Sequence, residues 1–354
     1  MNHLSKIAAK LPEYGLDAML ITSEAGERYA IGFHGEGLVL VTREGTHYST
    51  DGRYIEAAQE QVTGAEITQV SAGRGHLAQA RTYLENRGLH NVGFESGHMT
   101  VDTHRRYSQE LPCILTPAQP LLDGLRQSKD EEEQAAMRRA QQITDEAFKA
   151  ILDFIRPGLT EREIAARLIY ELLSRGGEAV SFDPIVAAGA NGSRPHAVPG
   201  DQVVDTGMLI TMDFGCKVEG YCSDMTRTVA LGQPTQEMEQ VYSVVLEAQQ
   251  AGIRAARAGI SGREVDAAAR RVIDQAGFGA YFTHSFGHSL GIEIHESPNA
   301  APGAEQLLPT GAVISAEPGI YLPGQFGVRI EDVLILKDGG CEDITRSPKD
   351  LIVL

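Results

Sequence analysis

The sequence predicts two domains: an α/β domain over residues 1–125, and an α+β domain over residues 126–354 that contains an internal pseudo-twofold repeat. Three observations lead to this prediction. Short apolar runs alternate with helical segments in the first third of the chain. The pattern breaks around residues 117–128, and a long helical stretch with an acidic first turn follows. Beyond it, four sequence elements occur twice in the same order, which chance similarity does not explain.

The composition excludes several classes of function. The 354 residues suffice for two domains of roughly 150 residues each, and 42% hydrophobic residues support a core. The formal net charge of −17 argues against nucleic acid and anionic membranes as partners. No signal peptide or membrane span is expected from the sequence. Four scattered cysteines without a CxxC pair are typical of a reducing compartment, so we expect a cytoplasmic protein.

The elements of the first domain are expected to alternate along the chain. The runs LDAMLIT, GLVLVT and HYSTDGRY predict strands, residues 53–62 and 75–86 predict helices, and NVGFE and CILTP predict two further strands. Strands that alternate with helices indicate an α/β domain. The second domain is expected to begin with a helix over residues 129–155, because the acidic residues of its first turn favour a helix N-terminus.

The repeat in the second domain starts with a pair of capped helices. RPGLTEREIAARLIYELLSRGG aligns with RAGISGREVDAAARRVIDQAGF, and in each segment a glutamate follows Thr160 or Ser261 by three residues, the spacing of a capping box. Two later pairs of segments also match: PHAVP with IHESP, and TGMLITMDFG with TGAVISAEPG. Each half therefore runs through a helix, a capped helix, an HxxP element and a strand that carries one carboxylate.

These carboxylates predict a metal site. Asp213 and Asp224 lie symmetrically about a turn expected at residues 217–220, so we expect them to face each other with Cβ atoms roughly 5 Å apart. Two like charges so close would destabilise the hairpin unless a cation lies between them. In the second half, Glu317 and Glu331 flank a longer turn and can pair in the same way. If the halves pack about a pseudo-twofold axis, the four carboxylates converge.

Histidines are frequent in the segment THSFGHSLGIEIHESP. We expect His288 to bind metal and His295 to donate a hydrogen bond in the transition state, as does the matching His196 of the other half. Four acids and one imidazole can hold two divalent ions such as Mn²⁺, an arrangement used for hydrolysis. A purely structural cation site, for instance for Ca²⁺, would leave the matched histidines unexplained. The nearby Asp332 and Tyr321 are expected to lie outside the site chemistry.

At these residues the sequence resembles the metallopeptidases of the pita-bread fold, which include aminopeptidase P, prolidase and methionine aminopeptidase. The resemblance covers nearly the whole chain and is strongest from residue 129 onward. It places the ordered metal ligands of the family, in MDFG, YCSDMTRT, FGHSLG, SAEPGIY and GVRIEDV, on Asp213, Asp224, His288, Glu317 and Glu331. The resemblance implies two divalent metal ions per subunit, with Mn²⁺ foremost and Co²⁺ or Zn²⁺ as alternatives.

The length of the first domain and the segments SFDPIVAAGANGSRPHAVP and VRIED resemble the proline-specific branch. This resemblance implies an exopeptidase that cleaves between an N-terminal residue and a following proline, either an Xaa-Pro aminopeptidase or an Xaa-Pro dipeptidase. It further implies that His196 and His295 contact the scissile region, that His284 lies beside the substrate proline, and that Arg329 supports the site. Glu317 is the candidate proton acceptor for the attacking water. Homodimers or homotetramers are usual in the family.

Two other functions remain open from the sequence. One is a methionine aminopeptidase-like enzyme on the same scaffold, which a comparison of Met-Ala with Xaa-Pro peptides would distinguish. The other is a non-catalytic binding module, since a fold alone does not fix function. The complete set of five candidate ligands argues against the binding module.

Overall fold

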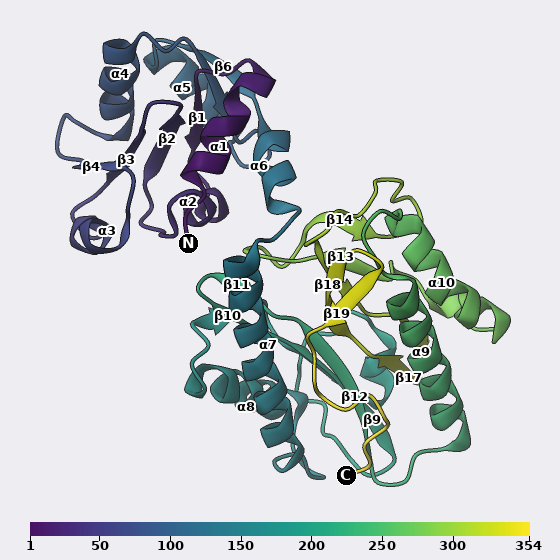
Figure 1. Ribbon diagram of the computed structural model, residues 1–354. Coiled ribbons are helices and arrows are strands. Elements are labelled where there is room, and N and C mark those ends of the chain that lie inside the picture. Colours follow the sequence, from purple (N-terminus) through teal and green to yellow (C-terminus); the bar gives the residue numbers. More distant parts are fainter. The chain divides into compact units, whose positions relative to one another are not determined.

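The structure is a computed structural model that describes residues 1–354 (Figure 1). The chain divides into two compact units, Met1–Arg126 and Gln127–Leu354. None of its helices is both long enough and apolar enough to cross a bilayer. The first unit has an α/β fold and the second an α+β fold, so the predicted fold class is confirmed.

A six-stranded mixed sheet forms the centre of the first unit, with the strand order β4-β3-β2-β1-β5-β6. Its strands are β1 (Ala18–Ile21), β2 (Leu38–Thr42), β3 (Thr46–Thr50), β4 (Glu66–Gln69), β5 (Asn91–Phe94) and β6 (Ile114–Pro117). The central strand β1 pairs with β2 in antiparallel and with β5 in parallel orientation. Every residue of β1 and β2 is buried, as expected for central strands that are covered on both faces.

The helices of the first unit were predicted only in part. They are α1 (Leu4–Lys10), α2 (Glu24–Ile31), α3 (Ile55–Gln61), α4 (His76–Arg87), α5 (Val101–Glu110) and α6 (Gln119–Arg126), with the 3-10 helix η1 at Leu11–Tyr14. Helices α3 and α4 and five of the strands form where the sequence predicts them. Strand β4 and helix α5 were missed because they lack an apolar pattern: β4 has no fully buried residue, and α5 buries only Tyr107.

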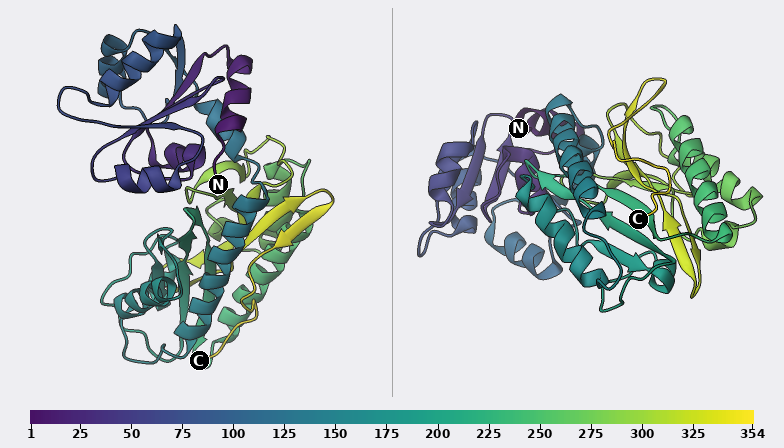
Figure 2. Two further views of the ribbon diagram at one scale, coloured as in Figure 1. Left: turned by 60° about the vertical axis from the view of Figure 1, so that its left-hand side comes forward. Right: turned by 90° about the horizontal axis from the view of Figure 1, so that it is seen from below.

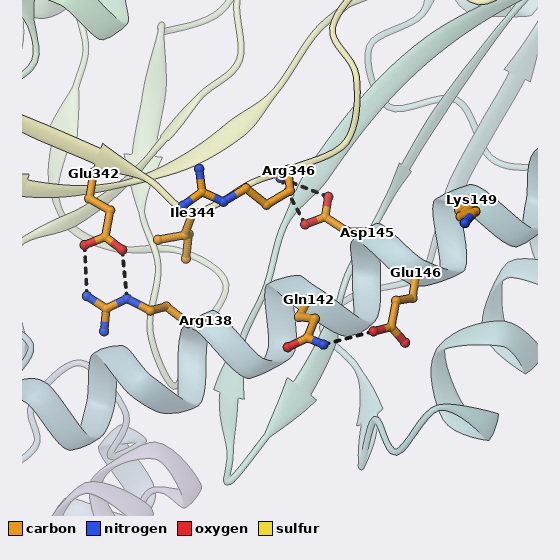
Figure 3. A pocket seen from close by; sticks show the side chains of 8 residues that line it. All are labelled: Arg138, Gln142, Asp145, Glu146, Lys149, Glu342, Ile344 and Arg346. Atoms are coloured by element: carbon orange, nitrogen blue, oxygen red, sulfur yellow. Dashed lines mark hydrogen bonds and ion pairs between the residues drawn. The ribbon is translucent and has the colours of Figure 1, made fainter.

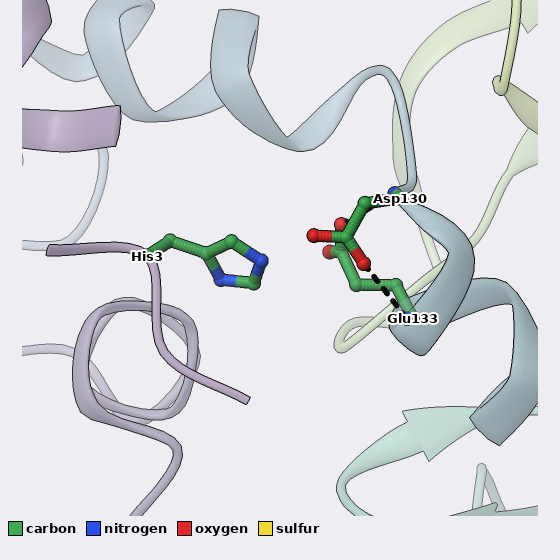
Figure 4. A group of neighbouring side chains, drawn as sticks. All are labelled: His3, Asp130 and Glu133. Atoms are coloured by element: carbon green, nitrogen blue, oxygen red, sulfur yellow. Dashed lines mark hydrogen bonds between the residues drawn. The ribbon is translucent and has the colours of Figure 1, made fainter. Parts of the chain in front are cut away.

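The first half of the second unit begins with two capped helices. It contains α7 (Glu131–Leu152), α8 (Glu161–Ser174), β7 (Ala179–Val180), β8 (Ile185–Ala188), η2 (Gly189–Ser193), β9 (Met208–Phe214), β10 (Cys216–Val218), β11 (Tyr221–Cys222) and β12 (Met225–Leu231). At the start of α7, Asp130 accepts a hydrogen bond from the Glu133 N–H, and the Glu133 carboxylate accepts one from the Asp130 N–H (Figure 4). This reciprocal cap fixes the first turn of the helix.

The second half repeats the same plan. It contains α9 (Gln236–Ala255), α10 (Gly262–Gln275), η3 (Gly279–Tyr281), β13 (Gly287–Ser289), β14 (Glu296–Ala300), β15 (Val313–Ala316), β16 (Gly319–Leu322), β17 (Phe326–Arg329), β18 (Asp332–Lys337) and β19 (Gly340–Asp343). The capping boxes predicted at Thr160 and Ser261 are both present. The helix pair α7–α8 lies on one side of strands β9 and β12, and the pair α9–α10 lies on the other (Figures 1 and 2). The predicted internal repeat is thereby confirmed.

A groove lined mainly by charged residues lies between α7 and the chain from β19 to Arg346 (Figure 3). Arg138 donates two hydrogen bonds of 3.0 Å to the Glu342 carboxylate, and Lys337 donates a third of 2.6 Å. These bonds, the Arg138 bonds foremost, lower the pKa of Glu342 to about 2. The ion pairs therefore connect the first helix of one half to the last strand of the other.

The ion pairs of Glu342 should stabilise the fold in a pH-dependent way. We expect Glu342→Gln to lower the free energy of unfolding at pH 7 by about 1 kcal/mol, the upper range for a partly exposed ion pair. A lowered pKa contributes stability above the unfolded value of about 4.3, and this contribution is lost as the pH falls toward 2. Urea unfolding at pH 7 and pH 3.5 should therefore show a smaller difference at the lower pH. As a control, Glu146→Gln, which removes an acid that pairs only with Gln142, should change little at either pH; an equal difference for Glu342→Gln at both pH values would contradict the prediction.

Candidate metal centre

The structure brings the five candidate ligands together at the ends of strands from both halves. They are Asp213 in β9, Asp224 before β12, His288 in β13, Glu317 after β15 and Glu331 before β18. Ligand atoms of Asp224, His288 and Glu331 all lie within 4.8 Å of one another. The His288 Nε2 atom is 3.3 Å from Glu317 Oε1 and 3.6 Å from Asp224 Oδ2.

In the second half, the predicted pairing of the two glutamates is correct. The β15–β18 ladder pairs Ala316 with Asp332, and the β16–β17 ladder pairs Gly319 with Arg329. The register is the same on both sides of the glutamates, so Glu317 and Glu331 stand opposite each other.

In the first half, the predicted pairing is wrong by two residues. Strands β9 and β12 pair Asp213 with Thr226, not with Asp224. The cause is the turn, which is a two-residue loop of Glu219 and Gly220, both with positive φ (50° and 79°). The centre of this hairpin lies between Glu219 and Gly220, one residue later than the turn expected from the sequence. Every residue of β9 therefore pairs with a residue two positions further along the chain than expected. Asp213 and Asp224 are therefore diagonal neighbours on one face of the hairpin, which still keeps them close.

The carboxylates of the cluster have unused acceptor capacity. Asp213 Oδ1, Asp224 Oδ1 and Glu331 Oε1 are buried and have no hydrogen-bond partner. Burying an uncompensated carboxylate is costly, and carboxylate oxygens with imidazole nitrogen are ligands that divalent cations accept. The donor set therefore fits divalent metal ions.

Burial and mutual repulsion shift the pKa values of these acids upward. Burial raises the pKa of Asp224 well above its ordinary value, and the neighbouring Glu331 carboxylate adds to the shift. Burial likewise raises the pKa of Glu331. For Glu317, burial raises the pKa to about 7 although the Arg329 guanidinium opposes the shift. Positive charge at this site would relieve the repulsion that these shifts report.

Hydrogen bonds fix the tautomer of His288. Its Nδ1 atom is 3.2 Å from the backbone carbonyl of Ser289, which can only accept, so Nδ1 carries the proton. The Nε2 atom then has its lone pair free toward Asp224 and Glu317, as metal-binding histidines do. Burial also lowers the pKa of His288, which keeps the ring neutral.

The other three histidines lie near this cluster. The rings of His288 and His295 meet edge to face, with centroids 4.5 Å apart. His196 lies close enough to lower the pKa of both His284 and His295, although burial is the main cause in each case. His196 and His295 are exposed, whereas His284 is half-buried. The first two are therefore accessible to a substrate.

Arg329, Tyr321 and His284 form a chain of hydrogen bonds beside the cluster. Arg329 donates through Nη2 to Asp213 Oδ2 at 2.7 Å and through Nη1 to the Tyr321 hydroxyl at 2.9 Å. Because His284 Nδ1 donates to the Ser285 carbonyl, its Nε2 accepts from the Tyr321 hydroxyl at 2.8 Å. Tyr321 was expected to lie outside the site chemistry, and this expectation is wrong, because its hydroxyl links Arg329 to His284.

Thr226 is a site residue that sequence reasoning missed. Its hydroxyl donates to Glu331 Oε2 at 2.6 Å and accepts from Arg329 Nε at 2.9 Å. Thr226 thus connects a strand of the first half to two residues of the second. The correct hairpin register could have identified it, since Thr226 is the cross-strand partner of Asp213.

Comparison with known proteins identifies the family. Residues 3–128 match the Creatinase/Prolidase N-terminal domain, and residues 135–338 match Metallopeptidase family M24. The chain belongs to metallopeptidase family M24. The chain is therefore a metallopeptidase, an enzyme that uses divalent metal ions, in agreement with the unpaired carboxylate oxygens of the cluster.

Relatives of this M24 metallopeptidase share both domains over their full length. The Xaa-Pro dipeptidase of Pyrococcus horikoshii is 32% identical over 356 residues, which cover 99% of this chain and 98% of the relative. The solved structure of an Xaa-Pro dipeptidase from Bacillus anthracis matches with a TM-score of 0.95 at 39% identity, over 99% of both chains. The X-Pro aminopeptidase from Thermotoga maritima matches with a TM-score of 0.92 at 35% identity, over 96% of this chain and 98% of the other. The pita-bread fold expected from the sequence is thereby confirmed.

Proposed function

We propose that this M24 metallopeptidase is a dinuclear exopeptidase that hydrolyses the bond between an N-terminal residue and a following proline. It would act as an Xaa-Pro aminopeptidase or an Xaa-Pro dipeptidase. The observation that carries the proposal is the convergence of four acids and one imidazole, with three carboxylate oxygens left unpaired. The relatives that are named Xaa-Pro dipeptidase and X-Pro aminopeptidase support the substrate class.

We assign two divalent ions to this site, Mn²⁺ foremost, with Co²⁺ or Zn²⁺ as alternatives. Their ligands are Asp213, Asp224, His288, Glu317 and Glu331. The free Nε2 lone pair of His288 and the three unpaired oxygens support this assignment. When bound, such ions supply a nucleophile from water at neutral pH and polarise the scissile carbonyl.

The side chains around the ions transfer the proton, stabilise the oxyanion and position a ligand. Glu317 takes the proton of the attacking water and passes it to the leaving proline nitrogen. His295 and His196, which are both exposed, donate hydrogen bonds to the oxyanion that develops on the scissile carbonyl. Arg329 holds Asp213 in place through the 2.7 Å ion pair.

We place the substrate proline against His284. Both ring nitrogens of His284 are already engaged, by the Ser285 carbonyl and by the Tyr321 hydroxyl, so the ring offers mainly its apolar surface. The Phe282 ring packs edge-on against His284 at 5.2 Å between centroids. Proline has no N–H to donate, so a surface without free acceptors suits it.

The proposal predicts cleavage that depends on both metal and proline. With Mn²⁺ present, we expect release of the N-terminal residue from Xaa-Pro and Xaa-Pro-Yaa peptides, and kcat/KM at least ~100-fold lower for matched Xaa-Ala peptides, because they do not fill the proline site. Met-Ala peptides serve as the methionine aminopeptidase control. Preference for the tripeptide would define an aminopeptidase, and cleavage of the dipeptide alone would define a dipeptidase. Metal binding without cleavage of any of these peptides would favour the binding module and contradict the proposal.

Assembly and location belong to the same proposal. We propose a homodimer or homotetramer, which sedimentation of the purified protein would test. A cytoplasmic location is supported by four free cysteines, since reducing compartments keep thiols unpaired.

A further inference from the structure

Glu161 is a buried carboxylate outside the metal centre. It is the first residue of α8 and is 0% exposed. Its partners are N–H donors: Oε1 accepts from the Ala188 N–H at 2.8 Å and the Asn191 side chain at 3.1 Å, and Oε2 accepts from the Gly200 N–H at 3.1 Å. No cation pairs with it. A buried carboxylate held by neutral donors is costly to remove, because truncation leaves those donors unsatisfied.

The donors to Glu161 enclose the segment that carries His196. Ala188 ends β8, and Gly200 follows the PHAVP segment, so Glu161 ties together two points on either side of His196. On the other side, Arg329 Nη1 donates to the Pro195 carbonyl at 3.2 Å. His196 therefore lies between one anchor at Pro195 and one at Gly200, in a stretch that forms neither helix nor strand.

The second half of the repeat shows what replaces Glu161 there. The equivalent residue at the start of α10 is Gly262, and a Cβ atom at this position would collide with the backbone carbonyl of Asn299. Asn299 belongs to β14, which begins directly after His295 and pairs with β13. In the second half, strand pairing thus holds the segment after His295, and the chain itself fills the space at the helix start.

Glu161 is not needed for the capping of its helix. Both helices start with the same reciprocal box, Thr160 with Glu163 and Ser261 with Glu264. The helix start therefore does not require a carboxylate at the position of Glu161. What differs between the halves is the following histidine segment, which is a paired strand in one half and irregular in the other.

We propose that Glu161 is a positioning residue that holds the His196 segment in its catalytic geometry. The inference rests on the proposed function, because it takes His196 as a hydrogen-bond donor to the oxyanion. A displacement of about 1 Å can lower the rate roughly 100-fold. Since this contact forms mainly in the transition state, Glu161→Ala should lower kcat by about 10- to 100-fold and change KM far less. Glu161→Gln should fall in between, because its amide retains one acceptor oxygen and turns an NH₂ group toward a donor.

A double-mutant cycle tests the coupling. The variants are Glu161→Ala, His196→Ala and the double variant, assayed on an Xaa-Pro tripeptide at saturating Mn²⁺. If Glu161 acts through His196, the double variant should lose no more kcat than His196→Ala alone. Glu163→Ala is the matched control, since it removes an exposed carboxylate from the same helix start. It should lower Tm and leave kcat within about twofold.

Hydrogen exchange of the metal-free protein gives a readout that does not depend on activity. In Glu161→Ala, the hydrogen-bonded amides of Arg194, Ala197 and Gly200 should exchange at least about 10-fold faster, whereas the non-proline amides of residues 296–300 should not change. Multiplicative losses of kcat in the double variant, or unchanged exchange at these three amides, would overturn the inference. Full activity of His196→Ala would instead refute the proposed role of His196, and the exchange data would still decide whether Glu161 holds the segment.

Discussion

Asp224→Asn should abolish peptide hydrolysis and, at the same time, stabilise the metal-free protein. Asp224 is 3% exposed and one of its oxygens has no partner; burial raises its pKa, and repulsion from Glu331, Asp213 and Glu317 raises it further. An asparagine of the same shape removes this repulsion and also removes a charged ligand. Because bound metal accounts for several kcal/mol of transition-state stabilisation, we expect kcat/KM to fall by ~1000-fold or more.

The gain in stability should depend on pH. A carboxyl group with a raised pKa binds its proton more tightly in the folded state, so it costs stability once the pH exceeds the unfolded value of about 3.9. The difference in Tm between Asp224→Asn and the wild type should be present at pH 7 and disappear toward pH 4. A gain of 1 kcal/mol corresponds to roughly 2–4 °C for a unit of this size.

Calorimetry of the EDTA-treated protein, with and without added Mn²⁺, measures both effects. In the wild type, Mn²⁺ at 100 times its Kd should stabilise the fold by about 2.7 kcal/mol, and this shift should shrink in the variant. Asp201→Asn is the matched control, because Asp201 is an exposed acid of the same half that pairs only with Arg162. The ligand assignment would be wrong if Asp224→Asn retained full activity or an unchanged Mn²⁺ shift.

Local sequence signals predicted much of this site, because ladders and caps obey short-range rules. The capping boxes at Thr160 and Ser261 follow from a three-residue spacing. The pairing of Glu317 with Glu331 followed from a hairpin whose register continues through both ladders. The pairing of Asp213 failed because its turn places a non-glycine residue, Glu219, at positive φ, which a composition-based reading does not detect.

Contacts between distant segments were beyond the reach of the sequence. Thr226 contacts Glu331, which lies 105 residues further along the chain. The Tyr321 hydroxyl contacts His284, which lies 37 residues earlier. Nothing in the local pattern distinguishes Glu161 from any other acid at a helix start. Its role emerges only from the comparison with Gly262, where β14 takes its place. The site residues that the sequence did not reveal are thus polar residues whose partners lie far away along the chain.

Arg227→Met should cost the protein about 3–5 kcal/mol of stability, the range expected when one partner of a buried ion pair is removed. Arg227 is 1% exposed and lies in β12, where every residue is buried. Its Nη2 atom donates to Asp332 Oδ1 at 2.7 Å, and Asp332 is 0% exposed. Without the guanidinium, Asp332 would retain Lys349 and Gln249 as partners but would lose the cation on its other oxygen.

The same guanidinium also joins β12 to two other segments through backbone carbonyls. Nη1 donates to the Glu331 carbonyl at 2.6 Å, and Nη2 and Nε donate to the carbonyls of Ser347 and Pro348. Arg227 therefore fixes the backbone of a candidate metal ligand and ties the C-terminal segment to β12. Its removal should weaken Mn²⁺ binding as well as the fold, since residues that support metal ligands typically change affinity 10- to 100-fold.

Urea unfolding of the metal-free variants measures the first effect, and titration with Mn²⁺ at a temperature where each variant is folded measures the second. Arg162→Met is the matched control, because Arg162 forms an exposed ion pair with Asp201 and should contribute less than about 0.5 kcal/mol. The double variant Arg227→Met/Asp332→Asn should recover part of the lost stability, because it removes the buried charge left without its guanidinium partner. If Arg227→Met were no less stable than Arg162→Met, the buried ion pair would not stabilise this fold, and the anchoring of Glu331 would have to come from Thr226 alone.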